Sequence, residues 1–225
     1  MNTNKKANYW ISTAFKNAFL LIIMCTVYAA IMCIGNDEKS IIKILNETIM
    51  FYYMIVSVAI GAVFCNTTIP IMLDIVLSLG STRKDAFKHI NIFVSIFTIL
   101  LTITFTILGL VTGKSISKLI PAIITYTSCI LFSSGIGAFG GAHNLKKGSK
   151  LLLIYFISML LSILLSIGLL LFSGTVNIMT GGDFSFDFAR FGTVITIVSV
   201  ILACIFYPLG MTKMKKQLYL HEVRI

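Results

Sequence analysis

The most constraining feature of this sequence is the distribution of its charges. Six long stretches contain no Asp, Glu, Lys or Arg, and each is at least 20 residues long. A helix needs about 20 apolar residues to cross a hydrocarbon core about 30 Å thick, so each stretch is long enough for one transmembrane helix. The six charge-free stretches are 17–36, 48–73, 90–113, 119–142, 151–182 and 191–212.

The composition fits a chain that is dissolved in a bilayer. Of its 225 residues, 57% are hydrophobic and 12% are charged, whereas soluble domains carry about 25% charged residues. The low share of charged residues excludes an ordinary soluble enzyme. The high hydrophobicity excludes a disordered chain, because disorder requires low hydrophobicity. The runs are continuous, unlike the alternating strands of a transmembrane barrel. We therefore expect an all-α integral membrane protein, a single domain over 1–225, with spans at about 17–36, 49–79, 90–112, 119–142, 151–173 and 191–212.

The basic residues predict the orientation. If the N-terminus is cytoplasmic, the inner segments hold 13 of the 18 basic residues, and the outer loops hold five basic and five acidic residues whose charges cancel. The positive-inside rule then places both termini in the cytoplasm. Topology and attraction to lipid headgroups account for the net charge of +10, and the bilayer, not a nucleic acid, is the expected partner.

The N-terminal segment combines basic and aromatic side chains at helical spacing. Thr3 can cap a helix, and Lys5 and Lys6 can reach lipid headgroups while Trp10 sits at the interface. We expect an interfacial amphipathic helix over 3–16 on the inner leaflet; a basic tail that leads into the first span is the alternative. The apolar face of this helix would consist of Ala7, Trp10, Ile11, Ala14 and Phe15.

The second span contains polar residues and a proline. Pro70 cannot donate a backbone hydrogen bond to the carbonyl of Asn66, so a kink is expected near Asn66. The helical pattern continues to Leu79, which gives a helix of about 46 Å whose last turns enter the cytoplasm. Asn66 and Thr67 are candidates for lining a transport pathway.

A cytoplasmic corner follows the second span. Gly80 is placed to end the long helix in the left-handed conformation. Thr82 can cap a new helix, and Asp85 can complete a capping box with it. We expect a short separate helix over 81–89 that leaves at a sharp angle. It would present basic side chains to water and an aromatic side chain to an apolar surface: Arg83, Lys84, Lys88 and Phe87.

Hydroxyl side chains recur along the third span, on one helical face. They are further candidates for pathway lining. For any one of them, a hydroxyl bonded to a carbonyl of its own helix is the favoured alternative. This face carries Ser95, Thr98, Thr102 and Thr106.

Small side chains recur every four residues in the fourth and fifth spans. Such faces let helix backbones approach closely within a bilayer, so both are expected to pack against other helices. The two faces are formed by Ser133, Gly137 and Gly141 and by Ser158, Ser162 and Ser166.

The spans lack the residues that catalysis or ion coupling requires. None contains Asp, Glu, Lys, Arg or His at the depth where ion-coupled carriers use such groups, and HExxH and GxSxG motifs are absent. The five cysteines show no CxxC spacing and are expected to be small apolar core residues, not metal ligands. We therefore expect no enzyme activity, no metal and no cofactor on this chain, and an energy source on another subunit.

The stretch Leu77 to Phe87, which follows a proline-bearing second span, resembles the loop after span 2 in ABC-2-type (type V exporter-like) permeases of Gram-positive bacteria. The six-span topology and the interfacial N-terminal helix are also similar to that family, so the resemblance covers most of the chain. It implies that 81–89 is a coupling helix that docks on a cytoplasmic ABC ATPase subunit. The implied coupling residues are Gly80, Ser81, Thr82, Arg83, Lys84, Asp85 and Phe87.

Within this resemblance, Gly80 would turn the chain, Arg83 and Lys84 would make polar contacts, and Phe87 would enter a hydrophobic cleft of the ATPase. ATP and Mg²⁺ would be bound by that subunit. Such permeases act in the bacterial cytoplasmic membrane as pairs, identical or not, and many export peptides, lipids or drugs, including in resistance to antimicrobial peptides. The segment 174–190 departs from larger family members, because it is too short for a pair of re-entrant helices.

Two other functions remain open. In the first, the chain does not transport and acts as a stand-alone membrane immunity or interaction protein. A carrier that works without an ATPase is disfavoured by the charge-free spans.

Overall fold

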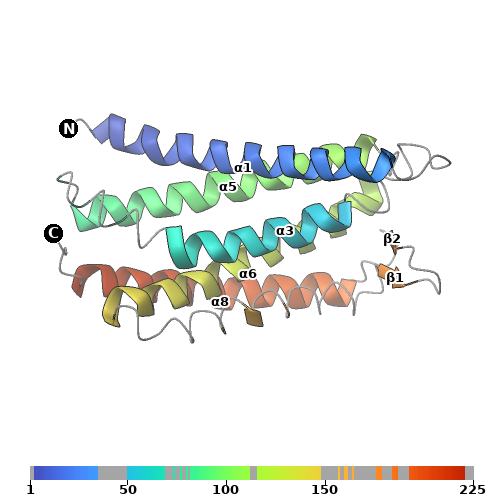
Figure 1. The fold of residues 1–225 in the computed structure, drawn as a ribbon. Helices are drawn as coiled ribbons and strands as arrows, with labels where there is room; N and C mark the ends of the chain where they lie inside the picture. Colours follow the sequence, from blue (N-terminus) through green and yellow to red (C-terminus); the bar gives the residue numbers. More distant parts are fainter. Residues whose placement is uncertain are drawn as a thin grey trace.

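The computed structural model describes residues 3–34, 50–68, 73, 77, 80, 82–111, 116–147, 157, 160, 161, 164, 176–178, 184–186 and 193–220. Its long helices lie side by side in a bundle (Figure 1). They are α1 (Thr3–Ile34), α3 (Met50–Val63), α5 (Arg83–Val111), α6 (Ile116–Lys147) and α8 (Thr193–Leu220).

Three helices in the described part of the chain are long and apolar enough to cross a membrane. They are Arg83–Val111, Leu119–Ala142 and Val194–Leu220, and they overlap the spans expected over 90–112, 119–142 and 191–212. A shorter apolar helix, Tyr53–Asn66, falls within the second expected span. Apart from residues 157, 160, 161 and 164, the fifth expected span lies outside the described residues.

The N-terminal helix differs from its expected form. Residues 3–16 do not make a separate interfacial helix, because α1 continues without a break to Ile34. The sequence explains this continuity, since no Gly or Pro lies between Thr3 and Ile34. Trp10 is 1% exposed, and its ring lies 5.9 Å from the ring of Phe93 on α5, edge to face. Trp10 of the expected apolar face therefore packs on a neighbouring helix, whereas Phe15 is 52% exposed.

The second span changes its winding near the expected kink. α3 gives way to a π-helical turn, η2 (Phe64–Thr68), which contains Asn66. A π turn adds a residue to the helical repeat, and this one comes just before Pro70, whose missing N–H weakens the preceding ladder of hydrogen bonds. The local irregularity expected near Asn66 is thus present.

Helix α6 packs against α3 on one face and against α8 on the other. A Cβ atom at Gly137 would collide with the backbone of Ala62 on α3, and one at Gly141 would lie 2.6 Å from the carbonyl oxygen of Cys65. On the other face, a Cβ at Gly135 would lie 2.5 Å from the Phe206 carbonyl oxygen. Backbones at these points are in direct contact, which only glycine permits.

Polar side chains inside the bundle are paired between helices. The Tyr126 hydroxyl of α6 donates to Ser57 Oγ of α3 over 2.8 Å, and Ser57 Oγ donates to the Met54 carbonyl over 2.9 Å. Thr125 Oγ1 and Thr196 Oγ1 lie 3.1 Å apart and join α6 to α8. Without these bonds, the hydroxyl groups would have no hydrogen-bond partner in the apolar core or in lipid.

A short hairpin precedes α8. Strands β1 (Val176–Ile178) and β2 (Phe184–Phe186) pair antiparallel, with Asn177 opposite Ser185. They lie within the segment 174–190, and the alternation of Phe184 and Phe186 with smaller residues is typical of a strand. This pairing was not expected from the sequence, which predicted an all-α protein.

Candidate docking site at the basic end of the bundle

One end of the bundle collects basic side chains, and we call it the basic end. Here α1 and α5 begin and α6 and α8 end (Figure 1). The Arg83 guanidinium at the start of α5 donates to the Tyr219 carbonyl near the end of α8 over 2.7 Å, so these two helix ends touch. The described basic residues with defined side chains on this part of α5 and α8 are Arg83, Lys84, Lys88, Lys213, Lys215 and Lys216.

The corner before α5 has the local structure that its sequence predicts. Gly80 has a φ of 78°, the left-handed region that glycine adopts most readily, and its N–H donates to the Leu77 carbonyl over 3.0 Å. The Asp85 N–H donates to Thr82 Oγ1 over 3.1 Å, and Thr82 Oγ1 donates to Asp85 Oδ2 over 2.6 Å. The predicted cap and capping pair are therefore confirmed.

The helix that follows the corner is longer than expected. Residues 83–89 are not a separate short helix but the first turns of α5, which runs to Val111. No Gly or Pro lies between Lys88 and Leu100 to end a short helix. The Asn91 side chain also bonds back to the Phe87 carbonyl over 3.0 Å and leaves the helix intact. The corner is thus rigidly joined to a candidate membrane span.

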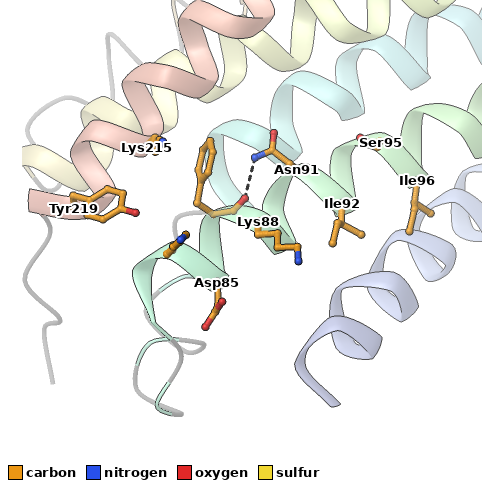
Figure 2. A pocket seen from close by; sticks show the side chains of 10 residues that line it. Asp85, Lys88, Asn91, Ile92, Ser95, Ile96, Lys215 and Tyr219 are labelled. Atoms are coloured by element: carbon orange, nitrogen blue, oxygen red, sulfur yellow. Dashed lines mark hydrogen bonds between the residues drawn. The ribbon is translucent and has the colours of Figure 1, made fainter. Parts of the chain in front are cut away.

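A cavity of about 710 Å³ opens between the start of α5 and the end of α8. Two of its side chains come from α8 and the others from α5 (Figure 2). We call it the α5–α8 cavity. It is lined by Lys84, Asp85, Phe87, Lys88, Asn91, Ile92, Ser95, Ile96, Lys215 and Tyr219.

The walls of the α5–α8 cavity combine an apolar surface with positive charge. Phe87 is half-buried and packs against the hydrophobic core, and Lys215 Nζ lies 5.7 Å from the centre of its ring. This cation–π contact orients an exposed lysine at the mouth of the cavity. Lys84 and Lys88 are also exposed, whereas Asp85 is engaged by Thr82. The surface is suited to an apolar side chain flanked by acidic groups.

The predicted coupling residues therefore have unequal roles. Lys84, Asp85 and Phe87 line the α5–α8 cavity, whereas Arg83 holds α8 through the carbonyl of Tyr219. Gly80 and Thr82 shape the turn, and Ser81 lies outside the described residues. The two residues contributed by α8 are Lys215 and Tyr219. They were not predicted from the sequence, although the clustering of lysines near the C-terminus was a visible signal.

The hydroxyl face of α5 does not line one continuous surface. Ser95 is exposed in the α5–α8 cavity, whereas Thr98 is buried. Thr102 Oγ1 bonds to the Thr98 carbonyl over 2.8 Å, and Thr106 Oγ1 bonds to the Thr102 carbonyl over 2.8 Å. These two hydroxyls follow the alternative expectation, in which each bonds to its own helix.

The remaining candidates divide between the bundle core and the undescribed part of the chain. Asn66 is buried in η2, which also contains Thr67. Ser133 is buried and donates to the Ile130 carbonyl over 2.9 Å. Gly137 and Gly141 contact α3 and η2 as described above. The expected packing residues of the fifth span, Ser158, Ser162 and Ser166, lie outside the described residues.

The described residues offer little for metal or thiol chemistry. Cys65 and Cys129 are buried and Cys204 is exposed, each as a free thiol. In the part of the chain that the structure describes, no three His, Cys, Asp or Glu side chains form a group that could hold a metal ion. Comparisons with protein-family models, with curated proteins and with solved structures found no match.

Proposed function

We propose that this chain is the membrane-spanning permease subunit of an ATP-driven exporter in a bacterial cytoplasmic membrane. In this proposal the α5–α8 cavity receives a side chain of a cytoplasmic ABC ATPase, and the substrate is amphipathic: a peptide, a lipid-like molecule or a drug. ATP and Mg²⁺ are bound by the ATPase, and two permease copies, identical or different, act together.

The observation that carries this proposal is the rigid connection between the corner and α5. A capped helix of 29 residues begins directly at the cavity and continues as a candidate span. A displacement of its first turn would therefore move the whole helix. Lys84 and Lys88 are exposed around the apolar wall formed by Phe87. An aromatic contact at the centre of a charged rim is the usual energetic arrangement of a docking interface.

The experiment compares ATPase recovery with three variants of the full-length chain. The tagged chain is purified from its native membranes, and any P-loop ATPase that co-purifies is identified and quantified. Phe87→Ala removes the apolar wall, worth about 2 kcal/mol, and is expected to lower recovery by about thirtyfold. Lys84→Ala removes one exposed charge and is expected to lower recovery by less than about fivefold.

Phe139→Ala is the matched control for Phe87→Ala. Phe139 lies at the same end of the bundle, also beneath a lysine, with Lys213 Nζ 5.6 Å from its ring centre, but it does not line the α5–α8 cavity. Its removal is expected to leave ATPase recovery unchanged. If the corner only fixes topology, Lys84→Ala disturbs orientation and Phe87→Ala is silent. If no ATPase co-purifies with the unmodified chain under any nucleotide condition, the transporter proposal is wrong.

A further inference from the structure

A second cavity lies on the other side of α8, between this helix and α6. Its volume is about 670 Å³, within the range of about 300–1,000 Å³ that is typical of ligand sites. Gly135 and Gly210 line it where the two backbones meet. We call it the α6–α8 cavity.

The walls of the α6–α8 cavity are apolar and face the region that lipid would occupy. Phe139 is 44% exposed, Leu209 is 58% exposed and Leu161 is 51% exposed, and all three line the cavity. Leu209 lies in the candidate span Val194–Leu220, and Phe139 lies in the candidate span Leu119–Ala142. In a bilayer such a surface is wetted by acyl chains, because water cannot occupy it favourably.

One edge of the α6–α8 cavity is basic. Lys213 and Lys216 both line it, together with Thr212. They lie three residues apart on α8, so their side chains share one helical face. Lys213 is oriented by its contact with the Phe139 ring at 5.6 Å. No acidic side chain is found among the described residues that line this cavity.

We infer that the α6–α8 cavity binds an anionic phospholipid. One acyl chain lies against Leu161, Phe206 and Leu209, and the phosphate contacts Lys213 and Lys216. Basic pockets between transmembrane helices on the cytoplasmic side are suited to acidic headgroups, and an apolar wall below two lysines is complementary to such a lipid. A zwitterionic lipid has the same chains but lacks the net charge that this edge favours.

The test measures lipid retention by the full chain in mixed micelles of phosphatidylglycerol and phosphatidylcholine, with bound lipid counted by native mass spectrometry. The unmodified chain is expected to retain phosphatidylglycerol in preference. In the double variant K213Q/K216Q, the ratio of retained phosphatidylglycerol to retained phosphatidylcholine is expected to fall about tenfold. In K213R/K216R this ratio is expected to stay unchanged. K215Q is the matched control, because Lys215 lies in the α5–α8 cavity.

A second pair of variants tests the apolar wall. Leu209→Trp fills the cavity and is expected to reduce phosphatidylglycerol retention by about tenfold. Ile205→Trp, on the same helix but not among the residues that line the cavity, is expected to leave it unchanged.

Three results would overturn the inference. They are equal retention of both lipids by the unmodified chain, a loss in K215Q as large as in K213Q/K216Q, and displacement of the lipid by millimolar inorganic phosphate. The last result would indicate a site for a small soluble anion.

Discussion

At the scale of single residues, the corner before α5 is governed by backbone conformation. Gly80 has a φ of 78°, and apart from its chain neighbours no atom of the described residues lies within 4 Å of the position that a Cβ would take there. The described residues therefore present no steric obstacle to a side chain here, and the expected cost comes from the left-handed backbone. Thr82 Oγ1 then accepts the otherwise free Asp85 N–H in the first turn of α5, and Asp85 Oδ2 accepts the Thr82 hydroxyl.

We predict that Gly80→Ala lowers the free energy of unfolding by about 1 kcal/mol, because alanine disfavours positive φ. Thr82→Ala should cost about 1 kcal/mol through loss of the helix cap. Lys84→Ala is the control and should be neutral or slightly stabilising, since a cation in the first turn opposes the helix dipole. Thermal unfolding in detergent measures all three; an unchanged midpoint for both Gly80→Ala and Thr82→Ala would contradict the prediction.

At the scale of elements, helix contacts at glycine determine how closely α6 and α8 approach. A Cβ at Gly210 would collide with the carbonyl oxygen of Gly135, a backbone atom that cannot move aside. At Gly109, the obstructing atom is Leu119 Cδ2, the end of a flexible side chain. The two positions therefore differ in how their surroundings can respond to one added methyl group.

We predict that Gly210→Ala destabilises the protein by about 2–3 kcal/mol through forced separation of two helices, whereas Gly109→Ala costs less than about 1 kcal/mol. The measurement is the midpoint of thermal unfolding in the same detergent. Equal losses for the two variants would show that close backbone packing is not what holds α8 against α6.

Features that depend on residues close together in the sequence were predicted, and features that depend on tertiary contacts were not. The Gly80 turn, the Thr82 cap and the three candidate spans depend on nearby residues or on summed hydrophobicity, and they were predictable. The continuity of α5 through residue 89 was missed because a capping signal marks where a helix begins but not how long it continues. The pairing of Gly135 with Gly210 and the position of Tyr219 depend on tertiary contacts, which no local pattern contains.

At the scale of the whole molecule, the asymmetry of charge between the two ends of the bundle predicts its orientation. The basic end contains the start of α5 and the end of α8, which Arg83 and Tyr219 join. The hairpin of β1 and β2 lies at the opposite end (Figure 1). The positive-inside rule therefore predicts that the basic end faces the cytoplasm.

This orientation predicts the labelling of single cysteines in a cysteine-free background. In sealed cells, a membrane-impermeant thiol reagent should modify Lys39→Cys and Asp183→Cys. It should not modify Lys84→Cys or Lys147→Cys until the membrane is permeabilised. Modification of Lys84→Cys in intact cells would reverse the orientation and would remove the α5–α8 cavity from the reach of any cytoplasmic ATPase.

The contact between Gly135 and Gly210 also has a mechanical consequence. The backbones of α6 and α8 touch at this point, so α8 would pivot here. The arm of α8 from Gly210 to Leu220 extends about 15 Å beyond the contact. A tilt of about 5° around this point moves the tip by roughly 1.3 Å. Because residues of this arm line both cavities, any such movement of α8 would change the shapes of the two cavities together.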